Sequence, residues 1–170
     1  FKVFYLGGQS NMDGYGYNSQ LPDSLNKISQ TVYIFHGNPV GDDEENGGLG
    51  KWQKVKPGHG VGFNSDSSKN NYSDRFGVEL SFAAKLQQYY PNEKIAIIKY
   101  SCGGTSLDSL ASYGGSWDPD FSGSNQYDHF LVTIKNAFNI KDIDGDGKED
   151  ILDPEGIIWM QGESDAVYTE

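Results

Sequence analysis

Hydrophobic residues gather in four short runs along the chain, each rich in β-branched or aromatic side chains and bounded by Gly, Asn or Pro. Runs of this length and composition are typical of strands that are buried on both faces. The predicted strands span residues 2–6, 31–35, 95–100 and 156–160.

Helical spacing distinguishes two further segments. The first carries apolar residues at three- and four-residue intervals, which would form one helix face: Phe76, Leu80, Ala83, Leu86 and Tyr90. Ser73 and Asp74 are its candidate N-caps, and Pro91 would end it. The second helix is expected from about residue 128 to residue 138, with an inner face made of Phe130, Leu131, Ile134 and Ala137.

The alternation of buried strands with amphipathic helices predicts an α/β domain whose parallel sheet is covered on both faces. Residues 37–71 are rich in Gly, Asn, Asp and Ser but contain Trp52 and Phe63, so we expect a long ordered excursion over the surface. The length of 170 residues fits a single domain, residues 1–170.

The charge of the chain narrows the class of partner. With 24 acidic residues against 13 Lys and Arg, the net charge is −11, which argues against nucleic acid and against an anionic membrane surface. No stretch is apolar over the length of a transmembrane helix. The single cysteine, Cys102, excludes an internal disulfide, and we interpret it as a packing residue.

Glycine-rich polar segments directly follow three of the predicted strands. Residues 7–12 read Gly-Gly-Gln-Ser-Asn-Met, residues 101–106 read Ser-Cys-Gly-Gly-Thr-Ser, and residues 161–165 read Gln-Gly-Glu-Ser-Asp. Because ligands bind beyond the carboxyl ends of strands in open parallel sheets, we expect these three segments to meet and to hold the chemistry.

Ester hydrolysis by serine needs a nucleophile, donors for the developing oxyanion and a base. Ser10 is the candidate nucleophile, since the glycines before it allow a sharp turn. The backbone amides of Ser10 and of Gly103 or Gly104, with the side-chain amide of Gln161, are candidate donors. His36 follows a predicted strand and is an open alternative for the base; the other interpretation is a cleft-lining or loop-bonding histidine.

These motifs resemble the SGNH-hydrolase superfamily, and within it the sialate O-acetylesterase-like and acetylxylan esterase branch, carbohydrate esterase family six. The resemblance covers nearly the whole chain. It implies a three-layer α/β/α flavodoxin-like domain that removes acetyl groups from sugars without a catalytic metal. It also implies Ser10 as nucleophile, Gly103 or Gly104 as the second-block glycine, and Gln161 as the oxyanion-hole amide. Glu163 matches a carboxylate that orients the histidine in some members; a structural hydrogen bond to loop amides is the alternative.

Members of this superfamily carry the catalytic histidine in an Asp-x-x-His motif near the end of the domain, and residues 1–170 lack it. We therefore expect this sequence to be the N-terminal portion of the domain. The histidine, a further strand and covering helices would come from a C-terminal continuation or from a second chain. A non-catalytic remnant of the same fold is the remaining account.

Residues 142–153 place acidic side chains at loop positions one, three, five, nine and twelve, with glycine at six, which is the spacing of an EF-hand-like calcium loop. Asp at position twelve resembles the loops of dockerins and thrombospondin type-three repeats. The candidate ligands are Asp142, Asp144, Asp146, the carbonyl of Lys148, Asp150 and Asp153. We expect an inserted structural Ca²⁺ site, with a solvated acidic turn as the alternative. Because calcium is abundant outside cells, the site favours a secreted or periplasmic protein.

Six aromatic residues in Gly- and Ser-rich loops could stack on sugar rings or pin the loops: Tyr15, Tyr17, Trp52, Phe63, Tyr113 and Trp117. Arg75 could bind substrate or pair with a neighbouring carboxylate. The sequence thus predicts a serine esterase that removes O-acetyl groups from an acetylated carbohydrate through an acyl-enzyme on Ser10. The alternatives are a calcium-stabilised glycan-binding module and an esterase of broader acyl specificity.

Overall fold

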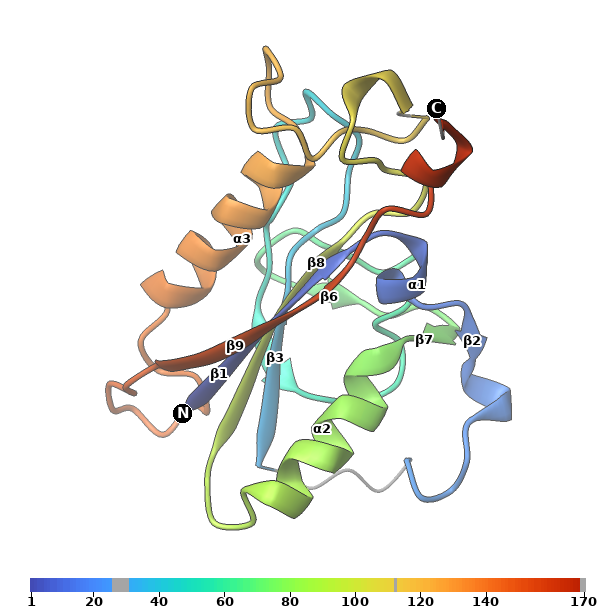
Figure 1. Cartoon of the computed structure of the whole chain (residues 1–170). Helices are drawn as coiled ribbons and strands as arrows, with labels where there is room; N and C mark the ends of the chain where they lie inside the picture. The colour runs from blue at the N-terminus through green and yellow to red at the C-terminus, as the bar shows by residue number, and fades with distance from the viewer. Residues whose placement is uncertain (26–30, 112, 169–170) are drawn as a thin grey trace.

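The computed structural model describes residues 1–25, 31–111 and 113–168, so residues 26–30, 112, 169 and 170 of the predicted domain lie outside it. A central sheet has the strand order β4-β3-β8-β1-β9 (Figure 1). Its strands are β1 (Lys2–Gly8), β3 (Val32–His36), β4 (Trp52–Lys54), β8 (Ile95–Ser101) and β9 (Asp153–Met160). The four predicted strands are therefore present, and three of them run into the motifs that follow them. Burial on both faces is confirmed for β3 and β8, but it is wrong for β9, which lies at the edge of the described sheet and is mostly exposed.

Four of these strands run parallel, and β4 pairs antiparallel with β3 at one edge. The sequence did not predict β4, because its three residues lie inside the long excursion. That excursion also holds β5 (Asn64–Ser65) and β6 (Asn70–Asn71), which form a small hairpin of their own. The expectation of an ordered segment is confirmed.

Helices cover both faces of the sheet. On one face α2 (Val78–Tyr89) buries Leu80, Ala83 and Leu86 against Leu6, Ile34 and Ile97. On the other, α3 (Gln126–Asn139) packs Ala137 and Ile134 against β1, β3 and β8. Figure 1 shows the two helices on opposite sides of the strands, which gives the predicted three layers. None of the described helices is long and apolar enough to cross a membrane.

Two local predictions about the helices were wrong. Ser73 and Asp74 do not cap α2, because residues Arg75–Phe76 form strand β7, which pairs with β2 (Gly16–Tyr17); the helix begins only after Gly77. Leu131 does not face inward but is 44% exposed, since the buried arc of α3 runs through Phe130 and Ala137. The N-terminus of α3 is closed by a capping box between Asn125 and Asp128.

Short elements complete the fold. They are α1 (Ser10–Asp13) and the 3₁₀ turns η1 (Asn18–Gln20), η2 (Ser109–Ala111) and η3 (Asp165–Tyr168). Strand β9 pairs with β1 alone in the described part of the chain. Its residues Ile157, Ile158 and Trp159 are 62%, 40% and 42% exposed, so apolar side chains of this strand face solvent.

Candidate active site

The carboxyl ends of three neighbouring strands lie level with one another. Gly8, at the end of β1, is in register with Ser101 of β8 on one side and with Met160 of β9 on the other. The three segments predicted to carry the chemistry therefore leave neighbouring strands at the same edge, and β1, which leads into Ser10, lies between β8 and β9.

The turn before Ser10 admits glycine only. Gly8 has a φ of 148°, and a Cβ at this position would lie 1.9 Å from the carbonyl oxygen of Met160. Backbone hydrogen bonds join Gln9 N to Met160 O and Cys102 N to Gly8 O. Both neighbouring loops are thereby tied to the segment that presents Ser10, which begins the single turn α1.

Gly103 lies beside Ser10, and Gly104 does not. A Cβ built on Gly103 would be 3.7 Å from the Ser10 Cβ and 3.4 Å from the Tyr15 hydroxyl oxygen. A Cβ built on Gly104 would instead lie nearest to backbone atoms of Gly114, and the φ of 76° at Gly104 favours glycine. Of the two glycines that the sequence left open, the geometry brings Gly103 to the candidate nucleophile.

Gln161 reaches the same region from β9. Its Nε2 lies 3.5 Å from the hydroxyl oxygen of the buried Thr105, the outer limit for a hydrogen bond. That hydroxyl donates to Cys102 O at 2.7 Å and accepts from Trp117 Nε1 at 2.9 Å. The short hydrogen bonds of the Thr105 hydroxyl are made with Cys102 and Trp117, so its contact with Gln161 Nε2 is weak. The Gln161 amide is therefore held only loosely next to the glycine turn.

The Glu163 carboxylate bonds the residues on both sides of Ser10, Gln9 and Asn11, and we call this pair of contacts the Glu163 clamp. The carboxylate accepts a hydrogen bond of 2.6 Å from Gln9 Nε2 and another from Asn11 Nδ2. The neighbouring Ser164 hydroxyl donates to Gln9 Oε1 at 2.9 Å. Partial burial acts to raise the pKa of Glu163, but the hydrogen bonds from Gln9 and Asn11 hold it below its ordinary value. The ionised carboxylate is therefore the form that the clamp requires.

Two aspartates near the motifs differ in their surroundings. Asp165 accepts from the backbone amides of Leu107 and Asp108, which ties the segment after β9 to the one after β8. The Asp13 side chain is buried, and its Oδ1 lies 3.5 Å from the Ser101 hydroxyl oxygen. Burial raises the pKa of Asp13 to about 6. The sequence places Asp13 close to the Ser10 motif, where a loop aspartate that bonds backbone amides is the ordinary expectation, and it does not reveal that this carboxyl group is buried.

His36 is not a surface base. Its side chain is fully buried, stacks on Phe63 with ring centroids 4.0 Å apart, and contacts His59 with 3.3 Å between the two Nδ1 atoms. Burial, with the charge of Lys99 nearby, holds the pKa of both His36 and His59 well below the ordinary value. The interpretation of His36 as a base is therefore wrong, because the residues 58–63 cover the end of β3. His129 is also buried, in α3.

The loop aromatics divide into two groups. Trp52, Phe63 and Trp117 are 5% exposed or less and belong to the core, so stacking on a sugar is excluded for them. Tyr15, Tyr17 and Tyr113 are exposed, and Tyr15 is the one whose hydroxyl borders Gly103.

Arg75 and Cys102 have structural partners. The Arg75 guanidinium lies 3.5 Å over the Tyr17 ring, forms an ion pair with Asp74 and donates to Tyr15 O. Burial raises the pKa of Cys102 to about 12, so its thiol stays protonated at neutral pH, as expected of a packing residue. Arg75 thus supports the backbone of Tyr15.

The acidic loop brings three of its predicted ligands together. Carboxylate oxygens of Asp142, Asp144 and Asp146 lie within 4.8 Å of one another. Asp150 instead accepts from the Ile143 amide, and Asp153 pairs in the sheet opposite Lys2. One Asp144 oxygen forms an ion pair with Lys94, and the other is buried without a partner in the described chain. The donor set consists of hard oxygens, which suits Ca²⁺.

Sequence reasoning missed the polar group beneath α1. Lys99 and Glu79 form an ion pair of 2.7 Å, and both side chains have no exposed surface. One signal was available, because Lys99 is the only charged residue in the apolar run of β8.

Known structures share this fold. A carbohydrate acetylesterase from Xanthomonas citri (XAC1771) is 17% identical with a TM-score of 0.55, and the match covers 97% of this chain and 33% of that one. An Arabidopsis thaliana protein is 17% identical with a TM-score of 0.60, covering 96% and 58%. NanS is 20% identical with a TM-score of 0.57, covering 99% and 56%. The chain therefore spans between a third and three fifths of these neighbours.

Comparison with curated proteins finds no match. At the identities above, structural likeness establishes the fold alone. The family described as carbohydrate esterase, sialic acid-specific acetylesterase, matches all of residues 1–170. With the serine, glycine and glutamine motifs at one sheet edge, this match over the full chain shows that the protein belongs to that family of carbohydrate esterases.

Proposed function

We propose that this chain carries the nucleophile and the oxyanion donors of a serine esterase that removes O-acetyl groups from carbohydrates. The observation that supports it most is the level ending of three strands, which brings Ser10, Gly103 and Gln161 to one edge. The family match and the carbohydrate acetylesterase among the structural neighbours agree with it.

In this mechanism the Ser10 hydroxyl oxygen attacks the acetyl carbonyl carbon, and the hydroxyl proton passes to a base. The tetrahedral oxyanion receives hydrogen bonds from the Ser10 and Gly103 amides and from the Gln161 side chain. The C–O bond to the sugar then breaks, the sugar oxygen takes a proton, and acetyl-Ser10 remains. Water hydrolyses this ester, which releases acetate and restores the hydroxyl.

The base is proposed to be a histidine that residues 1–170 do not supply. The three histidines of the chain, His36, His59 and His129, are all at most 4% exposed. The imidazole would come from a further segment of the protein or from a second chain, and Glu163 is one candidate to orient it.

Covalent labelling tests the role of Ser10. The protein that carries this chain is incubated with an organophosphonate ester, digested and analysed by mass spectrometry. We expect the adduct on the peptide that contains Ser10, and no adduct in Ser10→Ala. Ser19→Ala, a matched change in the exposed turn η1, should label like the wild type. Labelling of another serine would contradict the proposal.

The burial of all three histidines also favours a second candidate, a glycan-binding module without catalysis. That protein would bind an acetylated oligosaccharide in calorimetry but would form no adduct and release no acetate. For the esterase itself, a comparison of acetyl with butyryl esters separates acetyl specificity from broader acyl specificity.

We also propose that Ca²⁺ binds the carboxylates of Asp142, Asp144 and Asp146, whose mutual approach supports it. Three carboxylates at this spacing repel one another, and a divalent cation would remove that repulsion. The bound ion would hold the loop between α3 and β9 and has no part in the ester chemistry. Such a site agrees with a secreted or periplasmic protein.

A further inference from the structure

Lys99 lies in the middle of the sheet, and all three of its ammonium hydrogens have acceptors. Its Nζ donates to Asp13 O at 2.9 Å, to His59 O at 2.8 Å and to Glu79 Oε2 at 2.7 Å. The residue has no exposed surface. An ammonium group has three donors, so this buried cation is fully satisfied.

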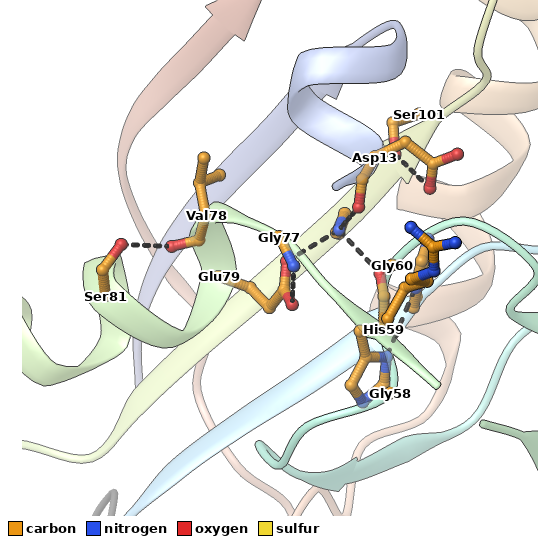
Figure 2. Close-up of polar contacts among 12 residues, drawn as sticks. Asp13, Gly58, His59, Gly60, Gly77, Val78, Glu79, Ser81 and Ser101 are labelled. Carbon is orange, nitrogen blue, oxygen red and sulfur yellow. Dashed lines mark hydrogen bonds and ion pairs between the residues drawn. The ribbon is translucent and has the colours of Figure 1, made fainter. Parts of the chain in front are cut away.

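The three acceptors come from three separate segments. Figure 2 shows Asp13 at the end of α1, His59 in the loop of residues 58–60 and Glu79 in the first turn of α2 converging on one point. The second Glu79 oxygen accepts from Gly77 N at 2.8 Å. Val61 N donates to Gly14 O, which ties the same loop to the residue after α1.

The α1 turn depends on such anchors. It has four residues, and a single isolated turn of helix is unstable in water. Carbonyl groups at a helix end lack partners within the helix. Here Ser10 O accepts from Gly14 N, and Asp13 O accepts from Lys99. At the other end, Gln9 and Asn11 are held by Glu163. Lys99 therefore holds the C-terminal end of α1, whereas Glu163 holds its N-terminal end.

Stability alone explains this ion pair poorly. Buried pairs are commonly no more stabilising than apolar residues of the same volume, because both charges lose their hydration. An apolar side chain, however, cannot give the three directed hydrogen bonds that set the position of α1 against β8 and α2.

We propose that Lys99 and Glu79 are positioning residues of the esterase: by holding Asp13 O, they fix the α1 turn and hence the place of Ser10 relative to Gly103 and Gln161. This inference rests on the proposed function. Neither residue touches the substrate, since both are fully buried beneath the site.

The test is a neutral double variant, Lys99→Met with Glu79→Gln, in the protein that carries this chain. Lys99→Met alone would leave an unpaired buried carboxylate and is expected to unfold the protein. In the double variant, Gln at 79 still accepts from Gly77 N, and both charges of the ion pair are removed together, so neither partner is left charged without the other. The matched control is Lys2→Met with Glu155→Gln, which removes an ion pair between β1 and β9 far from α1.

Two readouts are needed. The first is kcat and KM for an acetyl ester; we expect kcat to fall about 10- to 100-fold, with KM within about twofold, because misplacement of a nucleophile acts on the chemical step. The second is hydrogen exchange of the Asp13 and Gly14 amides, which bond within α1; we expect faster exchange there and unchanged exchange in β3. The control should match the wild type in both.

A kcat within about twofold of the wild type, or unchanged exchange at Asp13 and Gly14, would overturn the positioning role. If the wild type has no esterase activity at all, the proposed function fails. In that case the exchange result alone decides whether Lys99 and Glu79 fix the turn.

Discussion

The carboxylate of Glu163 accepts a hydrogen bond of 2.6 Å from Gln9, the residue directly before Ser10, although the two lie at opposite ends of the chain. The same carboxylate also bonds Asn11, the residue directly after Ser10. The end of β9 thus holds the candidate nucleophile from both sides.

Replacing Glu163 tests this clamp. Glu163→Ala removes both acceptors, and we expect kcat to fall about tenfold or more with little change in KM. Glu163→Gln keeps one amide oxygen and should lose less. Hydrogen bonds lower the pKa of Glu163, so the carboxylate should stay ionised to a pH below its ordinary pKa. The clamp should persist over that range and be lost when the carboxylate is protonated. Activity profiles over pH 3–8 measure this. If Glu163 only orients a histidine, Glu163→Gln and Glu163→Ala should be equally impaired.

The turn at Gly8 predicts a large and local effect. Gly8→Ala would place a methyl group 1.9 Å from Met160 O, so we expect a loss of more than about 3 kcal/mol in the free energy of unfolding. Gly156→Ala is the control, because a Cβ there meets open space in the same sheet; its effect should be below about 0.5 kcal/mol. Urea denaturation compares the two. Equal effects would show that β9 does not approach Gly8 as described.

Tyr15 borders Gly103 and offers an exposed ring next to the candidate nucleophile. We expect Tyr15→Ala to raise KM for an acetylated oligosaccharide about fivefold, equivalent to about 1 kcal/mol of lost ring contact. The KM for a small acetyl ester should change little, since such a substrate does not reach the ring. Tyr89→Ala, at an exposed position at the end of α2, is the control. A change of the same size for both substrates would argue against sugar stacking.

The buried histidine pair predicts a loss of stability in acid. The pKa of His36 and His59 is lower in the folded than in the unfolded chain, so the unfolded chain binds more protons below about pH 6.5. Each histidine should therefore reduce the free energy of unfolding by up to about 1.4 kcal/mol per pH unit below that point. Above it, their contribution is constant.

Asp13 acts in the opposite direction, since its pKa of about 6 lets the folded state keep a proton that the unfolded state loses. Comparison of the wild type with His36→Leu/His59→Leu separates the two contributions, because Asp13 is present in both proteins. Denaturation at pH 7.5 and 5.5 should show a smaller acid loss in the double variant. Equal losses would contradict the buried neutral pair.

Calcium binding is tested without reference to activity. Isothermal titration with CaCl₂ should show one site, and Ca²⁺ at about 100 times Kd should add about 2.7 kcal/mol to the free energy of unfolding. Asp142→Asn/Asp144→Asn should abolish both effects. Asp23→Asn removes an exposed carboxylate elsewhere and should leave them intact. Equal stabilisation of the double variant would assign the effect to non-specific screening.

The sequence by itself determined the parallel sheet, the two covering helices and the three motifs after the strands. These features rest on local patterns: a buried strand such as β8 is a short continuous apolar run, α3 repeats its apolar face along one helix, and Ser10, Gly103 and Gln161 follow strands directly. Parallel strands end at a common edge, so the placement of the three motifs at one edge follows from the sequence, whereas their adjacency depends on the strand order β8-β1-β9.

Only the tertiary structure decided which polar groups meet. The burial of His36 comes from residues 58–63, the contact of Glu163 with Gln9 spans nearly the whole chain, and Lys99 finds its acceptors on three separate segments. The physical reason is that local periodicity reports which face of an element is apolar, whereas the partner of a buried polar group is set by the packing of segments that are distant in sequence.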